Sequence, residues 1–327
     1  MKKIFTFLIM LSCIAIFVAC SSEESSNESS NASEKDVDYP RENIKLIIPY
    51  AAGGNMDVTG RIIADYASDY FDDYKFVVEN KEGGGAAIGD EFVANSEPDG
   101  YTLLLMGGSV MTNPLLTDVP YETEDFTPLS IYNLDSELLV VPKESDIETL
   151  DDFIEKAKEK NLKIATSGTQ TPHHFAAVKF ENEQDVEFDY LHADASEMYQ
   201  QLLGNHVEGA FTSGGEAINL IRDGSLRAIG IMGEERNERI PDVPTFKESG
   251  IDMNSGVFRG VAAPADTPDE VIKELDKRFN DLFHDEDLIK DMQESGFEYE
   301  YKNASEAQEI VEKEVEEIKE VLPDIED

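Results

Sequence analysis

The sequence predicts an α/β protein whose folded part forms two lobes. Short apolar segments typical of strands alternate with segments whose apolar residues recur every three or four positions, as in helices. This alternation favours parallel or mixed sheets covered by helices. Roughly 290 residues follow the N-terminal region, enough for two such lobes. The apolar runs 138–142 and 257–264 are typical of strands that connect lobes, and two crossings leave a cleft where small molecules usually bind.

Residues 1–20 form a targeting segment rather than part of the fold. A lysine-bearing start is followed by an apolar stretch over residues 4–18, which is too short to span a bilayer, and then by Ala19 and Cys20. Residues 17–20, Phe-Val-Ala-Cys, are similar to the bacterial lipobox. We therefore expect a lipoprotein signal peptide and an acylated Cys20 that anchors the chain to the lipid bilayer. Ordinary signal cleavage beside an incidental cysteine is the alternative.

Residues 21–40 are mainly Ser, Glu and Asn and hold almost nothing apolar. Such a segment cannot bury a core, so we expect a disordered tether that holds the folded part away from the membrane. The two cysteines of the chain, Cys13 and Cys20, both precede the folded part. Disulfides, thiolate catalysis and cysteine metal sites are therefore excluded there.

The charge is strongly acidic, with 27 basic against 70 acidic residues and a formal net charge of −43. Self-repulsion of this size destabilises a compact state in dilute buffer. At molar salt the Debye length is only about 3 Å, so most of the repulsion disappears. We therefore expect a halophilic source. Nucleic acid is a poor partner for so acidic a surface.

The first half of the folded part begins with a strand at residues 44–48, an apolar run that ends at Pro49. A helix follows, because Val58, Ile62 and Tyr66 recur every four residues and predict an apolar face. The next expected elements are a strand at 75–79, a helix from the glycines at 83–89 through Ala94, and a strand at 101–106 after a Pro-Asp-Gly turn.

The second half begins with a helix near residue 150, where Leu150, Phe153, Ile154 and Ala157 share one face. Apolar runs predict strands at 163–166, 209–212 and 227–232. Periodic segments predict helices that begin at 167–174 and that cover 198–203, 217–221, 271–282 and 310–321.

The turn between the first strand and the first helix contains Gly53 and Gly54. Glycines let a ligand approach the backbone closely, and free N–H groups at a helix N-terminus favour an anion. A P-loop would need Gly-Lys-Ser/Thr at this point, and a dinucleotide fingerprint would need a third glycine. The turn is therefore a candidate anion site, with a purely structural βα turn as the alternative.

A second strand-to-helix turn covers residues 166–174. It offers backbone N–H groups and the hydroxyls of Thr166, Ser167, Thr169 and Thr171 as further donors. His173 and His174 are adjacent and do not share a helical face, and no acidic partner stands at metal spacing, so a metal site is not expected.

Several motifs together resemble a known family. They are PYAAGGNMD at 49–57 with Arg61, VENK at 78–81 before three glycines, PDGYTLL at 98–104, Asn113-Pro114, PY at 120–121, DFTP at 125–128, GSLRA at 224–228, RIPDVPT at 239–245 and AAPA at 262–265. In order and spacing they resemble the Bug-type extracytoplasmic solute receptors of tripartite tricarboxylate transporters, over residues 41–320.

The resemblance implies a periplasmic-binding-protein-like (type II) fold of two lobes with a ligand cleft between them. Residues 41–140 plus 261–327 would form lobe 1, and residues 141–260 lobe 2. It implies a monomer that captures a small carboxylate, without cofactor, metal or enzymatic activity, and delivers it to the membrane permease subunits. The expected location is extracytoplasmic and lipid-anchored.

In this family two loops grip one carboxylate. The first loop maps onto Tyr50–Asp57 and the second onto Thr166–His174. The residues that we expect to contact the ligand are Tyr50, Ala52, Gly53, Gly54, Asn55, Asp57, Ser109, Thr166, Ser167, Gly168, Thr169, Thr171, His174, Asp194 and Phe258. Gln170, His192 and Phe258 depart from the usual Gly, aromatic stretch and Trp. Which carboxylate is bound therefore stays open.

Some site residues have a structural alternative. Asp57 is expected mainly to cap its helix and shape the first loop, and Arg61 and Arg259 to form structural ion pairs rather than to bind the ligand. No Gly-x-Ser-x-Gly elbow supports catalysis. A sensory module that reports to a signalling partner, and a hydrolase that uses the same cleft, are the competing functions.

The acidic composition predicts a strong dependence of stability on salt. The melting temperature of the protein should fall as KCl is lowered from molar to dilute, because screening of like charges is lost. Circular dichroism melting curves measure this, and KCl is chosen because it acts without the surface exclusion that makes sulfate stabilising. Curves that coincide at both salt levels contradict a halophilic adaptation.

Overall fold

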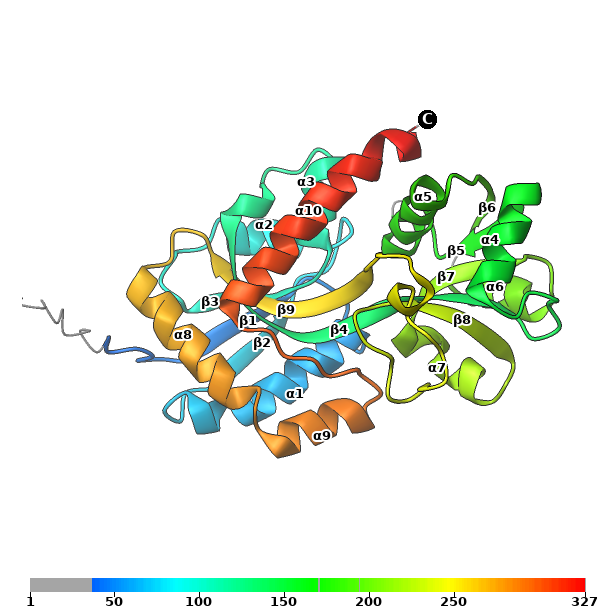
Figure 1. The fold of residues 1–327 in the computed structure, drawn as a ribbon. Coiled ribbons are helices and arrows are strands. Elements are labelled where there is room, and N and C mark those ends of the chain that lie inside the picture. Colours follow the sequence, from blue (N-terminus) through cyan, green and yellow to red (C-terminus); the bar gives the residue numbers. More distant parts are fainter. Residues whose placement is uncertain (1–36, 170, 194, 327) are drawn as a thin grey trace, which may run out of the picture. The chain divides into compact units, whose positions relative to one another are not determined.

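The structure is a computed structural model that describes residues 37–169, 171–193 and 195–326 (Figure 1). The expected signal peptide, its Cys20 and most of the expected tether lie outside the described residues, as do Gln170 and Asp194. Residues 37–327 form one compact unit.

Five strands form the first half of a nine-stranded sheet, in the order β2–β1–β3–β9–β4. Strands β1 (Ile44–Ile48), β2 (Phe76–Asn80) and β3 (Thr102–Met106) are parallel to one another. Strand β9 (Gly256–Pro264) is antiparallel to β3 and to β4 (Phe126–Pro142). β1 and β3 are buried along most of their length, as expected of apolar strands covered on both faces.

The second half of the sheet continues from the same strand β4, which is 17 residues long. β4 pairs antiparallel with β7 (Gly209–Ser213) and with β8 (Leu226–Met232). β5 (Leu162–Thr166) lies parallel to β7 and to β6 (Phe188–His192). β4 therefore belongs to both halves of the sheet.

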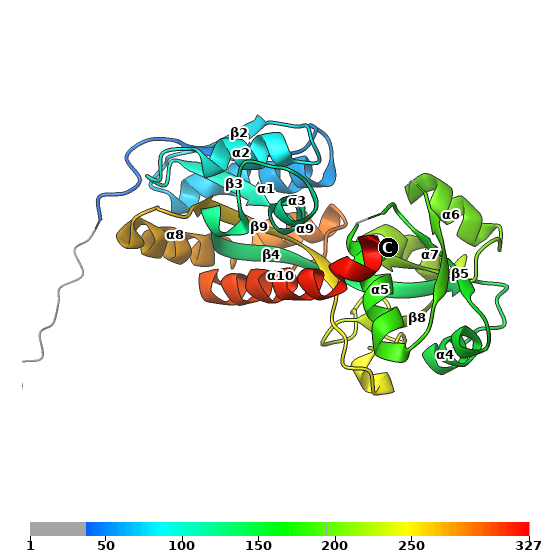
Figure 2. The ribbon, with the colours of Figure 1, turned by 90° about the horizontal axis from the view of Figure 1, so that it is seen from above.

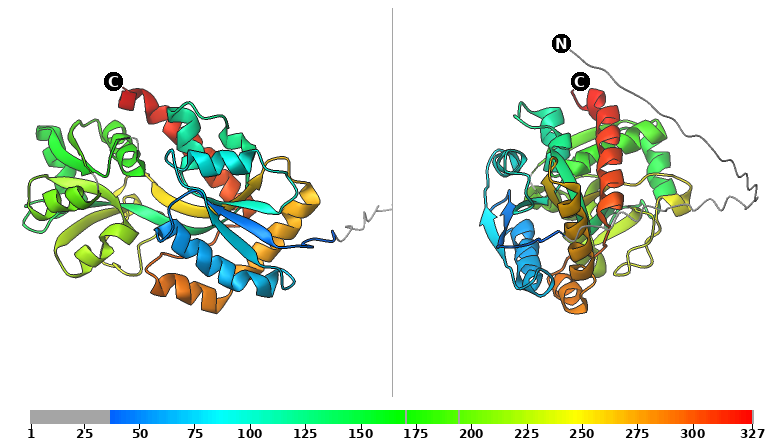
Figure 3. Two further views of the ribbon diagram at one scale, coloured as in Figure 1. Left: turned by 180° about the vertical axis from the view of Figure 1, so that it is seen from behind. Right: turned by 90° about the vertical axis from the view of Figure 1, so that its left-hand side faces the viewer.

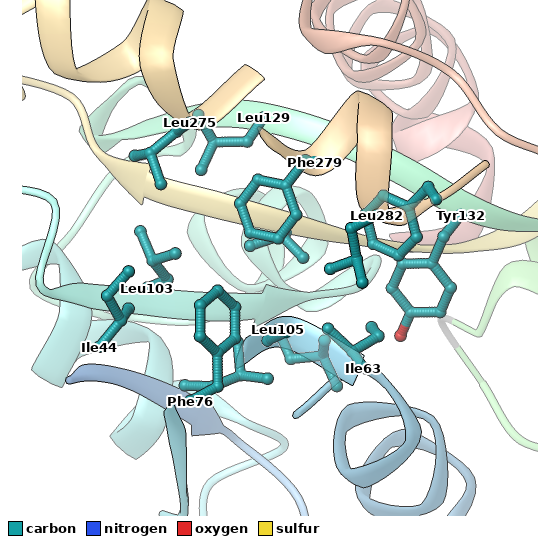
Figure 4. Packing of buried hydrophobic residues seen from close by; sticks show 14 of the residues in the cluster. Ile44, Ile63, Phe76, Leu103, Leu105, Leu129, Tyr132, Leu275, Phe279 and Leu282 are labelled. Atoms are coloured by element: carbon teal, nitrogen blue, oxygen red, sulfur yellow. The ribbon is translucent and has the colours of Figure 1, made fainter. Parts of the chain in front are cut away.

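Two layers of helices cover the first half. An apolar core joins the sheet to α1 (Asn55–Tyr70), α8 (Asp269–Leu282) and α9 (Glu286–Glu294). Figure 4 shows this cluster, in which Phe76 and Phe279 pack edge to face at 5.9 Å between ring centroids. A second core lies under α2 (Ala87–Ala94), α3 (Ser109–Leu116) and α10 (Ala304–Glu326).

The second half has its own cores. One lies under α4 (Leu150–Glu159) and α5 (Pro172–Gln184), and the other under α6 (Ala195–Leu203) and α7 (Gly214–Arg222). Two short 3-10 turns, η1 (Thr123–Asp125) and η2 (Lys247–Ser249), complete the elements. Figure 2 shows the end of α10 beside α5, where Lys179 pairs with Glu317 at 2.6 Å. The two-lobe α/β fold predicted from the sequence is confirmed.

Two local predictions need correction. The expected apolar face of α1 is only half-buried: Ile62 and Tyr66 pack against the edge of the core, and the fully buried positions include Gly60 and Ala67. These small residues let the helix approach the sheet: a Cβ on Gly60 would lie 2.6 Å from the Ile48 side chain. Figure 3 shows from behind how α1 lies against the strands.

The helix expected from residue 83 begins only at Ala87. The reason is the backbone of the three glycines at 83–85, which have φ values of +131°, +59° and +64°. These values lie in the left-handed region, which a right-handed helix does not use.

Replacing Phe279 by Ala should lower the free energy of unfolding by about 3–5 kcal/mol, because the side chain is fully buried and a cavity remains. Urea denaturation at molar KCl measures the loss. The control is Leu203→Ala on α6, whose side chain is 51% exposed, and it should cost under about 1 kcal/mol. Equal losses for the two variants contradict the assignment of Phe279 to the core.

Candidate functional site

The topology points the carboxyl ends of two groups of strands toward each other. β1 and β3 run in the same direction as β4, because β9 is antiparallel to both β3 and β4. β5 and β7 run opposite to β4. At the end of β3, Met106 pairs with Gly260 of β9, and Gly260 pairs with Ile131 of β4. At the end of β7, Ser213 pairs with Glu137 of β4. The ends of the two groups therefore face each other along β4 across residues 132–136, and both predicted loops follow such ends.

The first loop ends at Gly54, directly before α1. Gly53 has φ +85° and its N–H donates to Asp57 Oδ2 at 2.8 Å. The N–H groups of Asn55 and Met56 have no acceptor among the described residues. Ala52, Gly53, Gly54 and Asn55 are all exposed, so free donors of this turn are available to a ligand.

Asp57 is 3% exposed and fully engaged within the protein. Its Oδ2 also accepts from Arg61 Nε at 2.9 Å, and its Oδ1 accepts from Arg61 Nη2 at 2.8 Å and from Asn80 Nδ2 at 2.9 Å. The Arg61 guanidinium is the main cause that lowers the Asp57 pKa to about 2. Arg61 is in the expected ion pair, and Asp57 shapes the first loop through the Gly53 N–H, but the expected helix cap is absent because α1 has no side-chain cap hydrogen bond. The Arg61 contacts neutralise the carboxylate beside the turn.

Tyr50, Ser109 and Phe258 come together near Gly107. A Cβ on Gly107 would lie 3.6 Å from the Tyr50 hydroxyl and 3.9 Å from the Phe258 carbonyl oxygen. Burial raises the pKa of Tyr50, although the Ser109 hydroxyl opposes the rise. The Phe258 side chain is 3% exposed and packs in the apolar core under α3 and α10.

Asp90 lies beneath this group and was missed by the sequence reasoning. It is fully buried, and Tyr121 donates to its Oδ2 at 3.2 Å. Burial raises the pKa of Asp90 to about 7, and the hydroxyls of Ser109 and Tyr121 partly oppose this rise. Asp90 Oδ1 and Ser109 Oγ have no hydrogen-bond partner among the described residues. No local signal separates Asp90 from the other acidic residues in the sequence.

In the second loop, two of the hydroxyls expected to bind the ligand form hydrogen bonds within the loop instead. The hydroxyls of Thr166 and Thr171 donate to the Gly168 carbonyl at 3.0 and 3.2 Å, and Thr171 caps α5 by accepting from the His174 N–H. Gly168 has φ +125°. Ser167 is half-buried and Thr169 is exposed, so these hydroxyls are the ones left at the surface of the loop.

His174 is buried beside the ring of His192, with centroids 4.5 Å apart. Burial, and then the charge of His192, lowers the His174 pKa to about 4. The imidazole is therefore neutral near pH 7 and takes part in the packing of the loop against β6. Thr166 Oγ1 lies 2.8 Å from His192 Nδ1, which ties the two strands together at the same point.

Two carboxylates on β4 occupy the space between the facing strand ends, and the sequence reasoning missed them too. Both oxygens of Asp135 accept from the Gly215 N–H, each at 3.0 Å, at the start of α7. Glu137 Oε1 lies 2.7 Å from His173 Nδ1. Burial lowers the His173 pKa, but Glu137 outweighs it and raises the value to about 9.

A cavity of about 810 Å³ adjoins the same stretch of β4, where Leu134, Ser136 and Leu138 line it. Its walls come from β4, residues 231–239, 254–256 and 293–302, and α10. It contains none of the ligand contacts expected from the sequence. Within the described residues no group of His, Cys, Asp or Glu could hold a metal ion, and no helix has the length and apolar character needed to cross a bilayer.

Comparison with known proteins identifies the family. Residues 60–326 match the family described as "TctC: Tripartite tricarboxylate transporter family receptor". A UPF0065 protein of Cupriavidus necator is 32% identical over 245 residues, 74% of each chain. A TctC solute-binding protein from Polaromonas superposes with a TM-score of 0.83 at 28% identity, over 88% of this chain and 99% of that one.

An R. palustris protein solved with adipate has the same fold, with a TM-score of 0.69 at 23% identity over 88% of this chain and 98% of that one. At this identity the likeness concerns the fold alone. The match over more than half of the chain, the sequence identity to the C. necator relative and the shared fold agree. This chain belongs to the tripartite tricarboxylate transporter family receptors, which are extracytoplasmic solute-binding proteins.

Proposed function

We propose that this receptor captures a small organic carboxylate, a tricarboxylate, a dicarboxylate or a similar acid, between its two lobes and delivers it to the permease subunits of a tripartite tricarboxylate transporter. One observation carries the proposal: the loops after β1 and β5 follow strand ends that face each other along β4. Each loop leads into a helix N-terminus, α1 or α5.

A carboxylate fits the chemistry of these two turns. Helix N-termini carry unpaired N–H donors and a partial positive charge, and both favour an anion. Gly53 and Gly168 have positive φ values, which turn the backbone sharply without a side chain in the way. The charge of Asp57 is balanced by Arg61, so the donors of the first turn do not face a free negative charge.

The proposal includes the arrangement of the whole molecule. Residues 41–140 plus 261–327 form lobe 1, and residues 141–260 form lobe 2. The lobes close on the ligand because the ligand binds the closed arrangement more tightly. A monomer anchored to the bilayer through acylated Cys20 presents the closed form to the permease.

A ligand screen tests the carboxylate class. Citrate, malate and adipate are added to the full-length protein at molar KCl, with adipamide as the uncharged match of adipate. A ligand at 100 times its Kd should stabilise the fold by about 2.7 kcal/mol, seen as a rise in melting temperature. If sugars or adipamide raise the melting temperature while every carboxylic acid leaves it unchanged, the carboxylate proposal fails.

Replacing Gly54 by Val tests the first turn. Gly54 has φ −78° and ψ 171°, which Val adopts, and an added Cβ would meet only the Ala51 carbonyl oxygen at 3.4 Å. The fold should therefore persist while the branched side chain obstructs the N–H donors, and the Kd for the carboxylate found in the screen should rise at least about tenfold. Calorimetry measures the Kd.

Gly54→Ala is the matched companion, and its smaller side chain should produce a smaller loss. The melting temperature of each variant without ligand checks that the fold persists. Unchanged affinity in Gly54→Val would remove the first turn from the site.

A further inference from the structure

The cavity of about 810 Å³ has the size of a ligand site. One wall belongs to the half of the sheet that contains β8 and includes residues 231–239. The other comes from residues 293–302 and α10, which follow the helices of the first half. An occupant would therefore contact segments that are far apart along the chain.

The acidic side chains of this cavity outnumber the basic ones. The basic side chains are Arg236, Arg239, Lys302 and Lys313, and the acidic ones are Glu234, Glu235, Glu238, Glu298, Glu300 and Glu314. Three of the four bases already pair with a carboxylate of the protein: Arg236 with Glu248, Lys302 with Glu300, and Lys313 with Glu317. An anion would find little free positive charge here.

Two half-buried carboxyl groups of the cavity, Glu298 and Glu314, form no ion pair within the described residues. Glu298 accepts a hydrogen bond from Asn237, and Glu314 has no hydrogen-bond partner among the described residues. No Lys, Arg or His of the described chain lies within ion-pair distance of either. Arg239, which faces the same space, donates instead to the Gly296 carbonyl at 3.4 Å.

The surroundings of these two groups add negative charge. Burial, followed by the charge of Asp135, raises the pKa of Glu298 to about 7. Burial, followed by the charge of Glu317, raises the pKa of Glu314 to about 7, and Glu137 adds to this rise. Glu137 is fully buried and its Oε2 has no partner among the described residues. The charges of Arg239 on Glu298, and of Lys179 and Lys313 on Glu314, oppose these rises from beyond ion-pair distance. The carboxyl groups around the cavity therefore outnumber the nearby cations, and neither Glu298 nor Glu314 is in a direct ion pair within the described residues.

We propose that this cavity is a second ligand site, which binds a small organic ammonium ion with its charge at Glu298 and Glu314. Leu134, Leu138, Ile231 and Ile310 supply apolar wall for the body of such an ion. Tyr299 and Phe297 also line the cavity, and Arg259 already lies over the Phe297 ring, 5.7 Å from its centroid. An inorganic cation fits less well, because the described residues contain no metal-ligating group of three.

The test compares choline with its neutral isostere 3,3-dimethylbutan-1-ol on the full-length protein at a fixed high KCl concentration. The background K⁺ screens the exposed carboxylates and so suppresses unspecific binding of choline to the surface. Calorimetry should then show saturable binding of about one choline per chain and no binding of the alcohol. Equal heats for choline and the alcohol, or choline heats that never saturate, overturn the proposal.

Variants locate the site. Glu298→Gln combined with Glu314→Gln should raise the choline Kd at least about tenfold. The control is Glu309→Gln with Glu312→Gln, which makes the same charge change on the exposed face of α10 and should leave the Kd unchanged. If the first double variant fails to fold, Glu314→Gln alone, which removes no hydrogen bond, should raise the Kd about threefold. Wild-type affinity in the cavity variants overturns the proposal.

The pH dependence gives an independent readout. Choline keeps its charge at every pH, so any change in its affinity comes from the protein. Affinity should rise from about pH 6 to pH 8, because Glu298 and Glu314 ionise in this range and the cation binds the ionised form. The dependence should vanish in the Glu298→Gln, Glu314→Gln variant. A flat profile in the wild type contradicts the assignment.

Discussion

The direction of strand β4 is the constraint on which the rest of this structure depends. β4 is hydrogen-bonded to β9 in one half of the sheet and to β7 and β8 in the other. Because β1 and β3 run with β4 whereas β5 and β7 run against it, the strand ends that carry the loops must face inward from both sides. A parallel β4–β7 pair would send the second loop to the far edge of the molecule.

The same arrangement decides which helix N-termini are open to a ligand. The start of α7 is occupied by Asp135, whose two oxygens accept from the Gly215 N–H. The starts of α1 and α5 follow the two predicted loops. In α1 the N–H groups of Asn55 and Met56 have no acceptor among the described residues, whereas α5 begins with Pro172, which has no N–H, and Thr171 accepts from the His174 N–H. Asp135 thus occupies the start of α7, whereas the starts of α1 and α5, one in each half, are the positions proposed for an anion from outside.

Much of the fold was predictable because it rests on local patterns. The apolar runs that became β1, β3 and β5 and the helical faces of α4 and α8 depend on residues close together in the sequence. The sequence predicted only residues 138–142 of β4, since its first part contains Pro128 and the charged Asp135 and Glu137. Strand pairing on both sides, which no local pattern records, holds that part extended.

The site divides in the same way. The glycine turns after the strands could be recognised from the sequence. Which polar groups form hydrogen bonds within the protein, and which stay available to a ligand, could not. Asp57 turned out to be saturated by Gly53, Arg61 and Asn80, and the Thr166 hydroxyl is used within its own loop. Asp90 and Glu137 gained their unusual environments from burial, which arises only when distant segments pack. One carboxylate among 70 acidic residues gives no hint of this in the sequence.

The net charge of −43 and the proposed anion site are compatible because the two act over different distances. At molar salt the Debye length is about 3 Å, so the field of the surface carboxylates does not reach the loops, whereas a hydrogen bond of similar length is retained. The acidic cavity beside β4 differs, because its half-buried carboxyl groups are partly removed from the screening salt. Salt therefore weakens the surface repulsion more than the attraction of that cavity for a cation. A proposed anion site and a proposed cation site are therefore compatible within one chain.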